Sequence, residues 1–118
     1  MRTVLVVDDD PNFRTLAVRL LTASGLTVVG EAESVAAALV AADRLKPAAV
    51  LVDIELPDGD GVALTRQLVV LPWHPRVLLT SVDGDNTTTE EAQKAGAQAF
   101  VTKADLPDAP LARLLGDD

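Results

Sequence analysis

Polar residues follow several apolar runs in this chain, and their types suit phosphate chemistry. Asp8 and Asp9 come after one run, Asp53 after a second, Thr80 ends a third, and Lys103 follows a fourth. Clustered carboxylate oxygens suit a hard divalent cation such as Mg²⁺, which is often bound by carboxylates and phosphate oxygens together. A carboxylate beside that ion could attack phosphorus, while a hydroxyl donates to the phosphoryl group and an ammonium neutralises it.

Asp53 is the residue on which this chemistry depends most. The β-branched run 50–52 suits a strand buried on both faces, and Pro57, Gly59 and Gly61 prevent its continuation. Asp53 is therefore predicted at the carboxyl end of a strand, where open α/β sheets bind ligands. Taken alone, it would be interpreted as a turn-forming aspartate.

The surrounding elements are predicted from hydrophobic periodicity. Apolar runs predict five strands, at 3–7, 27–31, 50–53, 76–80 and 97–102. Between them, helical spacing predicts helices after the N-cap residues Asp10, Ser34 and Asp60. A polar stretch at 85–95 predicts a fourth helix, with Thr87 and Glu90 spaced as a capping box, and a last helix is expected at 106–115.

Strands that alternate with helices predict a parallel sheet covered on both faces, joined by right-handed crossovers. The pattern alone does not determine the strand order. Because parallel strands all point the same way, their polar ends should gather along one edge of the sheet. The three carboxylates, the hydroxyl and the ammonium are therefore expected to share one cleft.

Composition limits the class of protein. The length of 118 residues predicts one domain, residues 1–118, and 48% apolar with 24% charged residues is ordinary globular composition. A net charge of −8 argues against direct nucleic-acid binding, because the phosphate backbone is bound by clustered Lys and Arg. The chain has no cysteine, signal peptide or long apolar run, so we expect no membrane association and a cytoplasmic location.

Four motifs in order resemble the bacterial two-component response regulator receiver (REC) domain, over nearly the whole chain. They are VVDD at 6–9, DIELPDGDG at 53–61, LTS at 79–81 and GAQAFVTK at 96–103. The resemblance implies a single flavodoxin-like α/β domain, a five-stranded parallel doubly wound sheet in the order 2-1-3-4-5 with five helices. It also implies Mg²⁺-dependent phosphotransfer from a histidine kinase or phosphotransfer protein. Such a domain is a phosphoacceptor rather than an enzyme, apart from self-phosphorylation and autodephosphorylation.

The resemblance assigns the phosphoacceptor and its metal ligands. Asp53 matches the phosphoacceptor, which also binds the metal, and Asp8 and Asp9 match the acid pair that holds Mg²⁺ with it. Glu55 matches the position whose backbone carbonyl completes the metal shell. We expect the Glu55 and Asp83 carboxylates to flank the phosphoryl site and to change the lifetime of the phosphoryl group.

The resemblance also assigns a switch. Thr80 and Lys103 match the hydroxyl and lysine that contact the phosphoryl group, and Thr80 and Phe100 match the switch pair. The output surface would then comprise the fourth helix, the fifth strand and the last helix. We expect it to bind an output domain or a protein partner, and a homodimer is a further expected form of the protein. Ala104 departs from the family, because many receivers have proline there, reached through a cis bond.

Two other interpretations remain open from the residues. Asp8 and Asp10 after a buried strand resemble the nucleophile motif of haloacid-dehalogenase-like phosphatases, which would make Asp8 the nucleophile of a hydrolase. Against this interpretation, the chain has no room for a cap domain and lacks the usual acidic motif downstream of the lysine. Asp53 would also have no role in such a phosphatase. The other alternative is a phosphorylation-independent receiver that acts only as a binding module.

Overall fold

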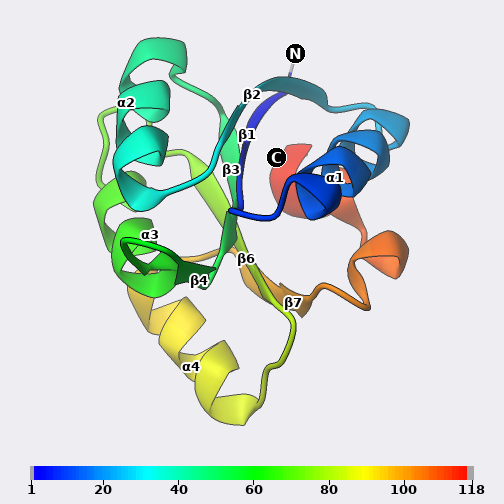
Figure 1. Ribbon diagram of the computed structural model, residues 1–118, viewed down its shortest axis with the longest axis vertical. Coiled ribbons are helices and arrows are strands. Elements are labelled where there is room, and N and C mark those ends of the chain that lie inside the picture. The colour runs from blue at the N-terminus through cyan, green and yellow to red at the C-terminus, as the bar shows by residue number, and fades with distance from the viewer. Residues whose placement is uncertain (1, 117–118) are drawn as a thin grey trace.

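A five-stranded parallel sheet forms the centre of the computed structural model, which describes residues 2–116 except the side chains of residues 86 and 87. Its strands are β1 (Thr3–Val7), β2 (Thr27–Ala32), β3 (Ala49–Asp53), β6 (Arg76–Ser81) and β7 (Ala99–Thr102). Their spatial order is β2-β1-β3-β6-β7 (Figure 1). Because β6 and β7 are the fourth and fifth strands of this sheet along the chain, the order is the 2-1-3-4-5 that the resemblance implied.

Four α-helices connect the strands: α1 (Pro11–Ala23), α2 (Val35–Leu45), α3 (Gly61–Val69) and α4 (Asn86–Ala95). The N-caps predicted at Asp10, Ser34 and Asp60 are confirmed, since each side chain accepts a hydrogen bond from a backbone N–H of its helix. Within residues 2–116, no helix combines the length and the apolar character needed to cross a membrane.

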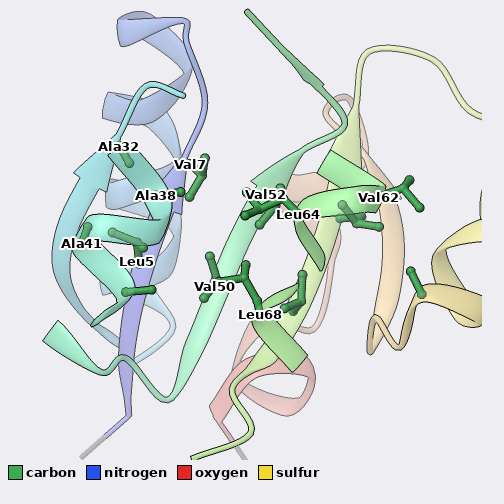
Figure 2. Close-up of a cluster of buried hydrophobic side chains, with 14 of the residues drawn as sticks. Leu5, Val7, Ala32, Ala38, Ala41, Val50, Val52, Val62, Leu64 and Leu68 are labelled. Carbon is green, nitrogen blue, oxygen red and sulfur yellow. The ribbon is translucent and has the colours of Figure 1, made fainter. Parts of the chain in front are cut away.

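The sheet separates two apolar layers because side chains alternate between its faces along each strand. Leu5, Val7, Val50 and Val52 point towards α2 and α3 on one face, as Figure 2 shows. Val4, Val6, Leu51 and Leu78 pack on the other face, against α1 and the C-terminal segment. Both faces are therefore covered, as the continuous apolar runs predicted.

The structure corrects the prediction at the chain's end. The expected helix at 106–115 is divided into a 3-10 helix (Leu106–Asp108) and a π-helix (Ala112–Gly116). Pro110 lies between them, and its missing N–H and fixed φ disfavour a continuous α-helix. Leu106, Leu111 and Leu115 are nevertheless buried, so the segment still covers its face of the sheet.

Two local features also differ from the prediction. The N-cap of α4 is Asp85, whose side chain accepts from the Thr88 N–H, so the cap predicted at Thr87 is wrong; the Thr87 side chain itself lies outside the described residues. The turn after Asp53 contains a two-stranded hairpin, β4 (Glu55–Leu56) paired antiparallel with β5 (Gly59–Asp60), which the sequence did not predict.

Candidate functional site

The three predicted acids meet at the carboxyl edge of the sheet. Asp8 follows β1 and Asp53 ends β3, and these two strands are neighbours in the sheet. One carboxylate oxygen from each of Asp8, Asp9 and Asp53 lies within 4.8 Å of the others. Asp8 is fully buried and Asp53 is 5% exposed, whereas Asp9 faces solvent. The cluster is thus open to solvent on the Asp9 side.

The backbone around Asp53 fixes its carboxylate. Oδ1 accepts a hydrogen bond from the Glu55 N–H at 3.2 Å, and the following Ile54 N–H donates to the Thr80 carbonyl at 2.9 Å. Burial raises the pKa of Asp53 from 3.8 to about 6. The Glu55 hydrogen bond and Lys103 oppose this rise in pKa, and the Asp8 charge adds to it.

Lys103 comes directly after β7 and reaches both buried acids. Its Nζ forms ion pairs with both carboxylates. It lies 2.8 Å from Asp8 Oδ2 and 3.4 Å from Asp53 Oδ2. Burial lowers the pKa of Lys103, but its interactions with Asp8 and Asp53 outweigh this effect and leave the pKa above 10.5. Residues 2–116 contain no cis peptide bond, so the link from Lys103 to Ala104 is trans.

Thr80 brings a buried hydroxyl to the same edge. It pairs with Asp53 in the register of β3 and β6, and its side chain is fully buried. Its Oγ1 has no hydrogen-bond partner among the described residues. A buried hydroxyl without a partner has an energetic cost, so Thr80 can gain from an acceptor placed at this edge.

Phe100 lies on β7, partly buried, and packs over the loop that follows β6. Its ring fills the space that a Cβ atom at Gly84 would occupy. A cavity of about 400 Å³ beside the ring is lined by Gly84, Asp85, Thr89, Phe100, Val101, Thr102 and Asp105. The predicted switch aromatic therefore borders both the loop after Thr80 and open space.

A cavity of about 370 Å³ opens onto Asp53. Its lining residues are Asp9, Asp53, Glu55, Leu56, Pro57, Val82 and Lys103. Val82, rather than Asp83, is the residue from the loop after β6 at this cavity. Asp83 lines an adjoining hollow of about 450 Å³ between the β4–β5 hairpin and α4, and this hollow shares Glu55 and Leu56 with the cavity at Asp53.

Two residues of the 53–61 motif support the site through contacts that the sequence did not predict. Asp58, in the β4–β5 turn, accepts from the Val35 N–H at 2.7 Å and the Ala36 N–H at 3.0 Å, at the start of α2. Gly61 lies so close to the Asp53 carbonyl that no Cβ atom fits there. Glycine and aspartate are common in turns, and their contacts here depend on segments distant in sequence.

Comparisons with known proteins agree with this geometry. Residues 4–113 match the family described as "Response regulator receiver domain". The chain is 30% identical to chemotaxis protein CheY of Thermotoga maritima, over 90% of this chain and 88% of that protein. The BeF3-activated receiver domain of RstA from Klebsiella pneumoniae superposes with a TM-score of 0.83 at 31% identity, covering 96% of this chain and 95% of that one.

Some relatives are much longer than this chain. A protein-glutamate methylesterase/protein-glutamine glutaminase of Myxococcus xanthus is 38% identical over 91% of this chain, but only 31% of that protein is covered. A putative transcriptional regulator of Pseudomonas aeruginosa is covered over 50% of its length. The match over residues 4–113 and the shared fold show that the chain belongs to the response regulator receiver domains of two-component signalling.

Proposed function

We propose that this domain accepts a phosphoryl group on Asp53 from a histidine kinase or phosphotransfer protein, with Mg²⁺, and so switches an output surface. The observation that carries the proposal is the position of Asp53. It lies at the carboxyl end of a buried strand, within one oxygen cluster with Asp8 and Asp9, and its Oδ2 faces Lys103. This combination of a nucleophile, metal-type ligands and a cation is what phosphoryl transfer to a carboxylate requires.

The donor set fits Mg²⁺. Its three carboxylate ligands supply only oxygen, which hard cations prefer, and the open cavity beside Asp9 leaves room for waters and phosphate oxygens. Asp8, Asp9 and Asp53 would hold the ion, with the Glu55 backbone carbonyl as a fourth ligand. When bound, Mg²⁺ supplies charge neutralisation between the carboxylates and the phosphoryl oxygens.

Asp53 acts as the nucleophile. Its carboxylate oxygen forms a bond to phosphorus while the phosphorus–nitrogen bond of the phosphohistidine breaks, and the imidazole leaves with that electron pair. Burial raises the pKa of Asp53, but the value of about 6 is still below neutral pH, so the carboxylate remains largely ionised and available to attack. The Lys103 ammonium, already 3.4 Å from Asp53 Oδ2, neutralises a phosphoryl oxygen as charge develops.

The switch uses the hydroxyl of Thr80. An acyl phosphate on Asp53 offers this buried hydroxyl a charged acceptor, and charge-assisted hydrogen bonds are the stronger kind. Movement of Thr80 would make room for the Phe100 ring, which changes the surface formed by α4, β7 and the C-terminal segment. An output domain or protein partner that prefers this shape shifts the population towards it.

Intact-mass measurement tests the acceptor. We expect a small phosphodonor such as phosphoramidate to add one phosphoryl group to the parent in Mg²⁺, and none in EDTA or in Asp53→Asn. The matched control is Asp83→Asn, a carboxylate in the neighbouring hollow, which should still be phosphorylated. Phosphorylation that persists in Asp53→Asn, or depends on Asp8 as the acceptor, would overturn the proposal.

A further inference from the structure

Lys103 has three neighbours that can hold its ammonium in place. Two are the Asp8 and Asp53 carboxylates, with oxygens 2.8 and 3.4 Å from Nζ. The third is the aromatic ring of Phe13, whose centroid lies 4.3 Å from Nζ. A cation at this distance over a ring face is attracted by the ring quadrupole.

The two carboxylates are also required elsewhere. If the proposed function holds, Asp8 and Asp53 bind Mg²⁺, and phosphorylation then makes Asp53 a mixed anhydride whose negative charge lies on the phosphoryl oxygens. Mg²⁺ would share the negative charge of Asp8 and Asp53 with Lys103, and phosphorylation would remove the charge of the Asp53 carboxylate itself. Both changes weaken the carboxylate ion pairs that hold Lys103 in the metal-free protein. The ring of Phe13 has no such competing role.

The protein holds Phe13 firmly in this position. It lies in the first turn of α1, which begins with Pro11 after the Asp10 cap, and only 8% of Phe13 is exposed. It belongs to the apolar cluster on the α1 face of the sheet, which also includes Ala17, Leu78 and Leu106. The Lys103 side chain is 17% exposed, so the cation and ring meet in a partly desolvated environment where their attraction is stronger.

We propose that Phe13 is a positioning residue, whose ring face keeps the Lys103 ammonium directed at the phosphoryl group when Asp8 and Asp53 are occupied. The inference rests on the proposed function but adds a residue that contacts neither phosphorus nor metal. The competing explanation is that Phe13 only fills the apolar layer.

Fluorination of the ring separates these two explanations. Phenylalanine with one, two or three ring fluorines, placed at position 13 by suppression, keeps the shape and progressively weakens the quadrupole. We expect the rate of phosphorylation by phosphoramidate in Mg²⁺ to fall stepwise, by about twofold to thirtyfold across the series. Mg²⁺ affinity should keep the parent value, because the ring is not an oxygen ligand.

Controls assign the effect to the contact with Lys103. The same fluorinated residues at position 100 should not reproduce the stepwise fall, and in Lys103→Met the series at position 13 should have no effect. A rate that is independent of fluorination, or a fall that persists in Lys103→Met, would overturn the inference and leave Phe13 as a packing residue.

A second readout does not depend on phosphorylation. The Lys103 ε-methylene protons should show an upfield ring-current shift in metal-free protein, absent in Phe13→Leu and retained when Mg²⁺ and beryllofluoride are added. Loss of this shift on adding Mg²⁺ and beryllofluoride would overturn the inference. If the shift is retained but the parent accepts no phosphoryl group, the proposed function fails while the contact itself stands.

Discussion

The two loops beside Asp53 are held in very different ways. The loop after β3 is held by two sets of hydrogen bonds. The Asp58 carboxylate in its middle accepts from two N–H groups at the start of α2, and the Gly61 N–H at its end donates to the Ile54 carbonyl at 2.7 Å. The N–H groups of Ala36 and Val35 also lower the pKa of Asp58. This loop and the strand end that it follows form the fixed side of the site.

The loop after β6 leads into a weakly packed helix. Among the described side chains of α4, only Ala92 and Ala95 are buried, and both are small. Thr80, at the start of this region, has a hydroxyl without a partner, and Gly84 leaves space that the Phe100 ring occupies. We call residues 80–95 the movable side, because little buried apolar surface opposes its displacement.

The contrast explains how one domain can hold a reacting group still and also change shape. A nucleophile and its metal ligands must stay close to the reactive geometry, which the fixed side provides through backbone contacts. A signal must shift the balance between two arrangements, which is easiest where few contacts are lost. Four substitutions test whether the two sides differ in this way.

The largest expected effect is that of Gly61→Ala on the fixed side. The added Cβ would overlap the Asp53 carbonyl and lie 2.8 Å from Ile54 Cα, and neither backbone atom can move without displacing β3. We expect a loss of about 2–4 kcal/mol in the free energy of unfolding, measured by urea denaturation. Gly59→Ala is the matched control, because its Cβ would meet only the Val35 side chain, and an equal loss there would contradict the explanation.

The second effect is a pH dependence that belongs to Asp53. Because its folded pKa is near 6 against 3.8 in the unfolded chain, the folded state retains a proton between these pH values that the unfolded state has lost. The metal-free parent should therefore lose stability as pH rises through this window, relative to Asp53→Asn. We expect Asp53→Asn to be more stable by about 1–2 kcal/mol near neutral pH and equal near the lower limit. A constant difference across the window would refute the assignment.

On the movable side, Thr80→Val should stabilise the protein while removing its response. Valine has the same shape and lacks the unpaired hydroxyl, so we expect a gain of about 1 kcal/mol in urea denaturation. The amide shifts that beryllofluoride and Mg²⁺ cause across 81–95 and Phe100 should shrink. The control is Thr65→Val, which should destabilise, because the buried Thr65 hydroxyl donates to the Gly61 carbonyl at 2.8 Å. Full-sized distal shifts in Thr80→Val would show that another group transmits the signal.

The smallest stability effect is expected for Gly84→Ala. Its Cβ would overlap a side-chain ring rather than backbone, and the ring can move into the adjoining cavity of about 400 Å³, so the loss should stay below about 1 kcal/mol. Fluorine NMR with a label on Phe100 should nevertheless report a changed ring environment in the unphosphorylated protein. A loss as large as that of Gly61→Ala would erase the distinction between the two sides.

Much of this arrangement could be predicted from local sequence. Each strand that carries a site residue is a continuous apolar run that stops at a polar residue, so the positions of Asp8, Asp53 and Lys103 at one sheet edge follow from periodicity and parallel topology. The caps at Asp10, Ser34 and Asp60 were predictable because a cap hydrogen bond joins residues two or three apart. At α4, several polar residues compete for the cap, and local pattern did not select Asp85.

The contacts that give the site its properties were decided only by tertiary structure. The clamp of Asp58 on α2, the ring of Phe13 over Lys103 and the Phe100 ring over Gly84 each join residues 16 to 90 positions apart. No periodicity records which ring meets which cation. The burial that raises the pKa of Asp53 and leaves the Thr80 hydroxyl without a partner likewise arises only when four strands and two loops enclose the same space.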